Sequence, residues 1–220
     1  MKKLKKLIKR HVKKNTYKVP FEPMSNVFGV DRGSPIDRLY MTDFLHNHQE
    51  YITGNCAEFG WPNFALNFEK NINEIHSFNC KDYHKNFELD LMDSTGLPNI
   101  NFYDSIICTN VLNFIPELEL AVENMMRMLK PNGVALVTVA GPSMVSLYDY
   151  ERWGDYWRFT DKGLHQLFKD YQIIASETYG NFYASAHFLN GSVTEEVDIK
   201  RLAHKDCAFQ ILNCIAVMRD

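Results

Sequence analysis

Residues 103–139, YDSIICTNVLNFIPELELAVENMMRMLKPNGVALVTV, decide the fold. The run 103–109 is rich in apolar and β-branched residues and contains no Gly or Pro, which predicts a buried strand. Residues 116–129 predict a helix, because Pro116 suits a first helical turn and apolar side chains recur at helical spacing. The sequence KPNG at 130–133 is typical of a helix end. The apolar run 134–139 then predicts a strand that is buried on both faces of a sheet.

The same alternation of strands and helices continues on both sides of this stretch. Toward the N-terminus we expect a helix from Pro35 to about Tyr51, strands at 55–59, 74–78 and 87–91, and a helical segment at 64–70. Toward the C-terminus we expect a helix at 161–171 and strands at 172–178 and 209–218. Strands that alternate with helices predict an α/β, Rossmann-like architecture, with a mainly parallel seven-stranded sheet and helices on both faces.

Composition indicates one domain preceded by a basic arm. The chain has 220 residues, of which 45% are hydrophobic, enough for a single core. Residues 1–14, MKKLKKLIKRHVKK, hold eight Lys or Arg and no acid, which leaves 16 basic against 27 acidic side chains, a net charge of −11, over residues 15–220. So acidic a domain, residues 15–220, is poorly suited to binding nucleic acid, because most of that binding comes from basic side chains that neutralise phosphates.

The basic arm has two interpretations. Leu4, Leu7, Ile8 and Val12 fall at helical spacing, so residues 1–14 predict an amphipathic basic helix. It is either a solvated terminal segment or a peripheral contact with an anionic membrane surface. No apolar run approaches the roughly 20 residues that cross a bilayer. The five cysteines are scattered without CxxC spacing, which favours a reduced, cytoplasmic compartment, and no Cys/His spacing predicts a metal site.

The quoted stretch resembles the core of class I S-adenosylmethionine-dependent methyltransferases of the type 11 branch. Asp104 matches the acid of the family's fourth strand, and LKPNG at 129–133 matches its L-K-P-G-G helix end. The segments VDRGSPIDRLYMTDFL (30–45) and WGDYWRFT (153–160) look like a subgroup found with polysaccharide biosynthesis genes. The resemblance covers roughly residues 28–180 and the last strand. It implies S-adenosylmethionine as cofactor and an antiparallel last strand.

The resemblance also implies a set of cofactor-binding residues, with departures from the family pattern. Pro62 and Phe64 stand where later glycines of the first loop are usual, and the second strand lacks its terminal acid. Asp93 is an alternative to Asp90 as the acid that meets the adenine. The candidates follow the first, third and fourth strands: Glu58, Phe59, Gly60, Trp61, Asp90, Leu91, Thr109 and Asn110.

The acceptor implied by the subgroup is a small molecule, a sugar or a glycan intermediate, methylated on oxygen. A hydroxyl acceptor needs a base, for which His165 and His187 are candidates, with Arg158 as a further catalytic residue. Substrate contacts are expected from one N-terminal group and one aromatic loop: Arg32, Arg38, Tyr40, Trp153, Tyr156 and Trp157. Three alternatives stay open. The acid–base pairs at 31–32 and 37–38 could be local ion pairs, and the loop aromatics could plug the core. The altered motifs also allow a catalytically inactive relative that acts as a binding or scaffold module.

Overall fold

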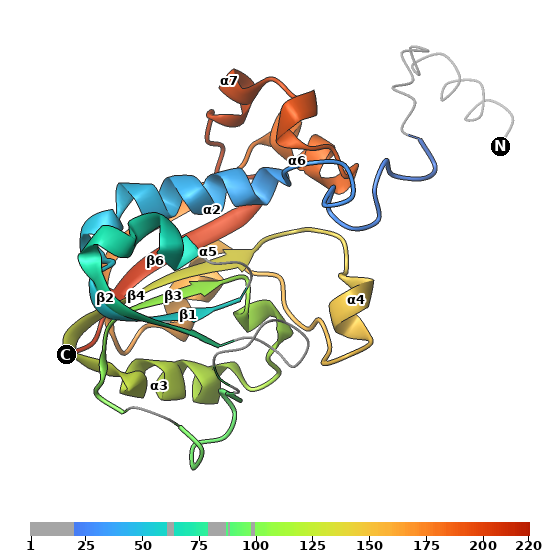
Figure 1. The fold of residues 1–220 in the computed structure, drawn as a ribbon. Coiled ribbons are helices and arrows are strands. Elements are labelled where there is room, and N and C mark those ends of the chain that lie inside the picture. Colours follow the sequence, from blue (N-terminus) through green and yellow to red (C-terminus); the bar gives the residue numbers. More distant parts are fainter. Residues whose placement is uncertain (1–19, 61–63, 79–86, 88, 98–99) are drawn as a thin grey trace, which may run out of the picture.

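The chain folds around one sheet whose parallel strands end at a common edge. The computed structural model describes residues 20–60, 64–78, 87, 89–97 and 100–220. The predicted arm, 1–14, and Trp61 lie outside these residues. Six strands are described, in the sheet order β2-β1-β3-β4-β6-β5 (Figure 1). Their bounds are β1 Gly54–Phe59, β2 Ile72–Phe78, β3 Tyr103–Thr109, β4 Leu129–Ala140, β5 Gln172–Tyr179 and β6 Leu212–Met218.

The pairing confirms a mainly parallel sheet with an antiparallel last strand. β1 pairs in parallel with β2 and β3, and β3 pairs in parallel with β4. β6 runs antiparallel to both β4 and β5, between which it lies.

The prediction of seven strands is wrong for the described part of the chain. Of the expected strand at 87–91, the structure shows an isolated bridge between Phe78 and Phe87. In the residues that follow, carboxylates accept hydrogen bonds from backbone N–H groups. Asp90 Oδ1 accepts from the Met92 N–H at 2.8 Å, and Asp93 Oδ1 accepts from the Thr95 N–H at 2.8 Å. Such Asx turns satisfy the backbone locally and compete with a sheet ladder.

Helices cover both faces of the sheet, as predicted, and separate two cores. Figure 1 shows α2 on one side and α3 on the other. α2 shares its core with η2, α6 and α7, whereas α3 shares its core with α5. The bounds are α2 Ile36–Asn47, η1 Gln49–Tyr51, η2 Phe64–Asn71, η3 Leu112–Phe114, α3 Leu118–Met128, α4 Leu147–Tyr150, α5 Asp161–Leu167, α6 Phe182–Leu189, η4 Thr194–Glu196 and α7 Ile199–Leu202.

Strand periodicity explains why the central strands are apolar throughout. In β3, Ile106 and Cys108 belong to the α3 core, while Ile107 between them belongs to the α2 core. All three are fully buried. Successive strand residues point to opposite faces, so a strand covered on both sides needs apolar residues at every position. Each of the two isoleucine side chains contributes about 1.5–3 kcal/mol by leaving water.

No helix among the described residues is long and apolar enough to cross a membrane.

Candidate functional site

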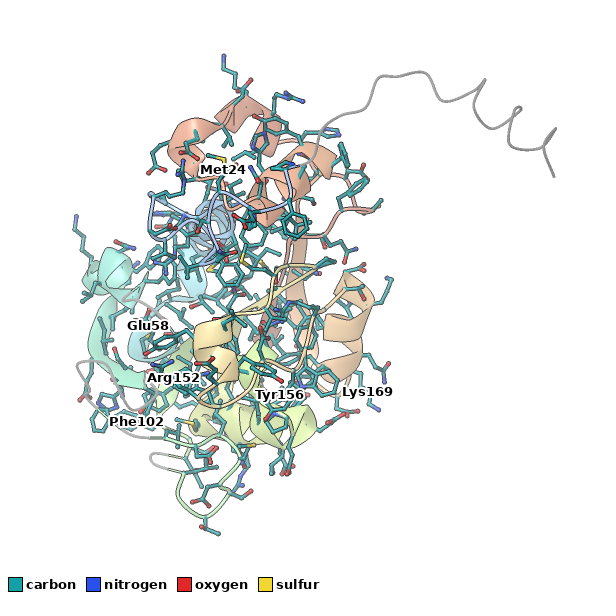
Figure 2. All side chains as sticks on the ribbon, turned by 90° about the vertical axis from the view of Figure 1, so that its right-hand side faces the viewer. Met24, Glu58, Phe102, Arg152, Tyr156 and Lys169 are labelled. Atoms are coloured by element: carbon teal, nitrogen blue, oxygen red, sulfur yellow. The ribbon has the colours of Figure 1, made fainter. Side chains whose placement is uncertain are left out.

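The parallel strands place their carboxyl ends at one edge of the sheet, which Figure 2 views end-on. β1 ends at Phe59, β3 at Thr109 and β4 at Ala140. In open α/β sheets ligands bind outside the carboxyl ends of the strands. Two further segments border this edge: the start of α2, and the loop from Gly141 to Thr160 that carries α4.

Glu58 is the buried acid of this edge. It is 2% exposed, and its Oε1 accepts from the backbone N–H groups of Phe64 at 2.5 Å and Ala65 at 3.4 Å. Its Oε2 is buried and has no hydrogen-bond partner among the described residues. Burial raises the pKa of Glu58 to about 7, although the two N–H groups act in the opposite direction. Oε1 thus fixes the start of η2, whereas Oε2 could accept a hydrogen bond from a ligand or contact a cation.

Gly60 lets the end of β1 close against the end of β3. Its φ is +101°, and a Cβ there would lie 2.5 Å from the Thr109 carbonyl oxygen. Only glycine adopts this conformation without strain. The space a side chain would need is therefore filled by backbone of the neighbouring strand, so Gly60 shapes the edge through protein packing.

Asn110 and Asp37 meet across this edge. Asn110 follows β3 with φ +52°, and its Nδ2 donates to Asp37 Oδ2 at 3.3 Å. Asp37 lies in the first turn of α2. Asp37 Oδ1 and Asn110 Oδ1 are both buried without a hydrogen-bond partner among the described residues. Burial raises the pKa of Asp37 to about 6, while Arg38 and Asn110 act to lower it.

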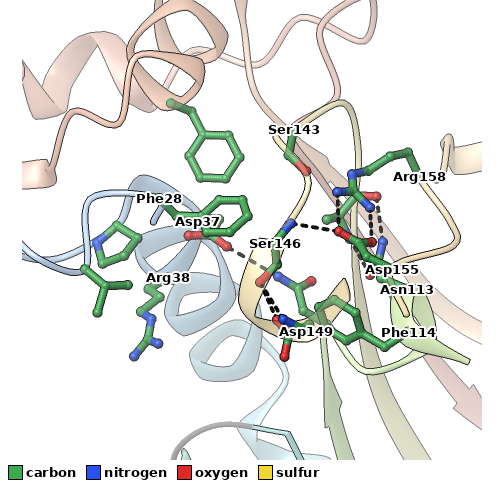
Figure 3. A pocket seen from close by; sticks show the side chains of 15 residues that line it. Phe28, Asp37, Arg38, Asn113, Phe114, Ser143, Ser146, Asp149, Asp155 and Arg158 are labelled. Carbon is green, nitrogen blue, oxygen red and sulfur yellow. Dashed lines mark hydrogen bonds and ion pairs between the residues drawn. The ribbon is translucent and has the colours of Figure 1, made fainter. Parts of the chain in front are cut away.

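A cavity of about 180 Å³ opens between this pair and the loop after β4 (Figure 3). Arg38 lines it beside Asp37, and Ser146, Asp149 and Arg158 line the opposite wall. Apolar side chains, among them Phe28 and Phe188, complete the wall. The cavity therefore joins an apolar lining to a few charged and polar groups, as small-molecule sites do.

Arg158 holds the loop wall in place. Its guanidinium contacts Asp155 twice, at 2.5 and 2.8 Å, and donates to the carbonyl oxygens of Met144 at 2.6 Å and Trp157 at 2.8 Å. Asn113 anchors the same loop, because its Nδ2 donates to the Trp157 carbonyl oxygen at 2.7 Å. This use of the planar, multiple-donor guanidinium makes Arg158 a structural support of the cavity that it lines.

The loop aromatics are partly exposed, so they do not simply plug the core. Tyr156 is 50% exposed and Trp157 is 41% exposed. The indole N–H of Trp157 donates to the Ile115 carbonyl oxygen at 2.8 Å. The ring of Trp153 meets that of Tyr148 edge to face, with centroids 6.1 Å apart. These rings lie on the same loop as Asp155 and Arg158, which line the cavity; Figure 2 labels Tyr156 on this loop.

The two candidate histidines do not line the cavity. His165 lies on α5, with Nε2 2.8 Å from Ser176 Oγ, and so belongs to the α5–β5 surface. His187 lies on α6, with Nδ1 3.1 Å from Ser192 Oγ. Burial and the nearby Arg201 lower the pKa of His187.

Several other predicted residues occupy structural positions. Tyr40 is 2% exposed, and its hydroxyl donates to the Leu202 carbonyl oxygen at 3.0 Å, which places it in the α2 core. Phe59 is buried and stacks on Phe78, with centroids 5.1 Å apart. Leu91 is buried in the α3 core, whereas the adjacent Asp90 is exposed.

Neither acid–base pair near α2 forms the neighbouring ion pair that the sequence allowed. Arg32 pairs with Glu196, Asp31 accepts from the Ser25 hydroxyl at 2.5 Å, and Asp37 faces Asn110. Asp37 and Asn113 are among the site residues that the sequence did not predict as candidates, as are Ser146, Asp149 and Asp155 on the loop after β4. Asp37 could have been found as an acid in the first turn of a predicted helix, and Asn113 by its N-x-x-N spacing from Asn110 after the most apolar predicted strand.

Residues 51–137 match the family model described as "Methyltransferase domain". This stretch runs from η1 into β4 and contains Glu58, Gly60 and Asn110. The fold is a methyltransferase fold. The match supports the prediction of an S-adenosylmethionine-dependent methyltransferase, with S-adenosylmethionine as cofactor.

Solved methyltransferases share this fold at low sequence identity. The N-methyltransferase NodS from Bradyrhizobium japonicum WM9, in complex with S-adenosyl-L-homocysteine, aligns with a TM-score of 0.56 and 13% identity, over 84% of this chain and 88% of NodS. The CurJ carbon methyltransferase aligns with a TM-score of 0.56 and 14% identity, over 87% of this chain and 57% of CurJ. The methyltransferase fold thus serves acceptors of different chemistry among these neighbours.

A curated relative is "Probable polyketide synthase 9/36" of Dictyostelium discoideum, 25% identical over 156 residues. Those residues are 63% of this chain and 5% of the relative, so the chain spans about one twentieth of its length.

The residues of this methyltransferase fold suit the methionine end of the cofactor. That end carries an ammonium group, and Glu58 Oε2 is a buried acceptor without a donor among the described residues. A cation placed there would satisfy the oxygen and favour the ionised carboxylate.

Proposed function

We propose that this chain is an S-adenosylmethionine-dependent methyltransferase that methylates a hydroxyl group of a sugar or glycan intermediate. The observation that carries the proposal is that buried oxygens of Glu58, Asp37 and Asn110, near the carboxyl edge, have no hydrogen-bond partner among the described residues. Each lies where this fold binds ligands, and each costs about 1–3 kcal/mol unless a ligand supplies the missing donor.

The chemistry divides between cofactor and chain. The cofactor supplies an electrophilic methyl group on a sulfonium. Glu58 would hold the ammonium of its methionine portion, while Asp37 and Asn110 face the neighbouring cavity. The main task of the chain is to orient the acceptor oxygen toward the methyl group, since positioning supplies much of the rate in group transfer.

The loop aromatics support a sugar acceptor. Tyr156 and Trp157 present half-exposed rings on the loop that also contributes Asp155 and Arg158 to the cavity. Such rings combine an apolar face with a polar end. The apolar face suits the C–H face of a pyranose, and the cavity oxygens accept from its hydroxyl groups.

Cofactor binding tests the first part of the proposal. S-adenosylhomocysteine at 100 times its dissociation constant should add about 2.7 kcal/mol to the free energy of unfolding, seen as a rise in Tm. Glu58→Gln should weaken this binding at least tenfold. Glu123→Gln, an exposed position on α3, should leave it unchanged. A folded protein whose melting does not respond to millimolar ligand would favour the inactive scaffold.

Methyl transfer tests the second part. The chain is incubated with methyl-tritiated S-adenosylmethionine and with hexoses, hexuronic acids and nucleoside-diphosphate hexoses. Label should enter one of these acceptors, and the product should carry the methyl group on oxygen. Binding of S-adenosylhomocysteine without label in any of them would reject the sugar acceptor while keeping the cofactor.

A peripheral membrane contact through residues 1–14 is part of the proposal, since the arm concentrates eight basic side chains. Each basic residue near an anionic surface is worth about 1 kcal/mol. Vesicles containing 30% phosphatidylserine should bind the full chain at low salt and should not bind a variant lacking residues 1–14. Equal binding of both would refute the contact.

A further inference from the structure

Asp37 and Asn110 form a pair that needs a hydrogen-bond donor from outside the described chain. Asn110 Nδ2 and Asp37 Oδ2 satisfy one another, but the other oxygen of each side chain is buried without a partner among the described residues. Both unmet atoms are acceptors. A ligand that satisfies them must therefore carry O–H or N–H groups, and an aliphatic or purely anionic ligand would not.

The cavity beside the pair suits part of a ligand. Its volume of about 180 Å³ is smaller than the roughly 300 Å³ at which pockets for whole small molecules begin. Glu58, the residue suited to the cofactor's methionine end, lies one residue before the end of the neighbouring strand β1 and does not line this cavity. Glu58 and this cavity therefore occupy different places along the carboxyl edge.

Building on the methyltransferase function proposed above, we infer that Asp37 and Asn110 bind the reacting hydroxyl of the acceptor and that Asp37 accepts its proton. In the transfer, the acceptor oxygen bonds to the methyl carbon as the methyl–sulfur bond breaks. The electron pair of the broken bond stays on sulfur, which yields S-adenosylhomocysteine. The hydroxyl proton passes to Asp37 Oδ1 and reaches solvent after the product leaves, so no further reactant is needed.

The electrostatics of the pair agree with this role. Burial raises the pKa of Asp37 to about 6, so the group is mainly ionised at pH 7.5 yet far more basic than an exposed aspartate. A general base works best when its pKa lies near the working pH. The charged groups around it are Arg38 on α2 and Asp149, Asp155 and Arg158 on the opposite loop. The cavity residues that follow β3 and the Phe188 ring from α6 carry no charge.

The experiment compares Asp37→Asn with Asp43→Asn, an exposed position on the same helix. Turnover is measured with tritiated S-adenosylmethionine and the sugar acceptors named above, and S-adenosylhomocysteine binding by calorimetry. Asp37→Asn should lower kcat at least 100-fold, in the range of lost general bases, with cofactor affinity within about twofold of wild type. Asp43→Asn should match wild type in both.

A second variant reads out the ionisation of Asp37. Asn110→Gly keeps the positive φ but removes the amide whose hydrogen bond lowers the pKa of Asp37. The acidic limb of kcat/KM should lie near pH 6 in wild type and move to higher pH in Asn110→Gly. A purely structural Asn110 would lower activity without moving the limb.

The outcomes separate this inference from the function on which it rests. A wild-type chain that transfers no methyl group contradicts the proposed function and the inference with it. A wild type that transfers label, with Asp37→Asn equally fast, overturns the inference alone. Loss of cofactor binding in a folded Asp37→Asn would assign the residue to the cofactor subsite and also overturn it.

Discussion

The buried carboxyl of a single residue, Asp37, lowers the free energy of unfolding at neutral and higher pH. Burial raises the pKa of its carboxyl from 3.8 to about 6. The folded state thus binds this proton more tightly than the unfolded state does, and the group favours folding below about pH 4. That contribution is lost as the pH rises through 6, at a total of about 3 kcal/mol, because each pKa unit corresponds to about 1.4 kcal/mol.

Asp37→Asn should therefore be more stable than wild type at pH 8, by up to about 3 kcal/mol, because the amide has no charge to bury. Near pH 4 the two proteins should have similar free energies of unfolding. Urea unfolding at both pH values measures the difference. An advantage of Asp37→Asn that is equal at the two pH values would show that the carboxyl is not the cause.

Single residues were predictable from the sequence where they follow a strand. The family's first-loop pattern predicts Glu58, and Asn110 is predicted because it follows an apolar strand; the structure places both at the carboxyl edge. The contact between Asn110 and Asp37, 73 positions apart, has no local signal. The histidines were selected on chemistry alone, and chemistry does not indicate which face of a helix meets a cavity.

At the scale of elements, the turn between α3 and the central part of β4 depends on one asparagine. Asn132 has φ +63°, its N–H donates to the Arg219 carbonyl oxygen at 2.7 Å, and the Arg219 N–H donates to the Gly133 carbonyl oxygen at 3.0 Å. The left-handed conformation is tolerated by Asn and Gly and costs other residues roughly 1 kcal/mol or more.

Asn132→Ala should therefore destabilise the protein by about 1 kcal/mol, which for a chain of this size lowers Tm by roughly 2–4 °C. Asn132→Gly should stay within about 0.5 kcal/mol of wild type, because glycine adopts the conformation freely and keeps the N–H. Calorimetry on the two variants measures the loss of stability and tests whether the left-handed backbone conformation is its cause. Equal losses in both variants would mean that the asparagine side chain, rather than the backbone, matters.

Element types followed from periodicity better than element ends did. β3 has its predicted bounds, since nothing in that run competes with a strand. The expected strand at 87–91 failed because Asp90 and Asp93 bind their own backbone, which an apolar count does not detect. β4 begins at Leu129, five residues before the predicted strand, because the KPNG turn extends along β3 through the pairing of Leu129 with Tyr103.

At the scale of the whole molecule, β6 links β5 to the parallel strands of the sheet and packs against α2. It pairs with β4 on one side and β5 on the other, and its central Ala216 is fully buried in the α2 core. The sequence shows β6 as an apolar run and the family resemblance implies its antiparallel direction, whereas its place between two earlier strands was not predicted. Asp37, at the start of α2, therefore depends on a strand that is distant in sequence.

Ala216→Asp should unfold the protein or leave it without a cooperative transition. An uncompensated buried charge costs several kcal/mol, which is comparable to the roughly 5–15 kcal/mol that holds a domain together. Met218→Asp places the same charge at the less buried end of the same strand and should fold with a lower Tm. Near-ultraviolet circular dichroism and urea unfolding separate the two cases. If Ala216→Asp kept wild-type unfolding and bound S-adenosylhomocysteine normally, the packing of α2 on β6 would not be what positions the site.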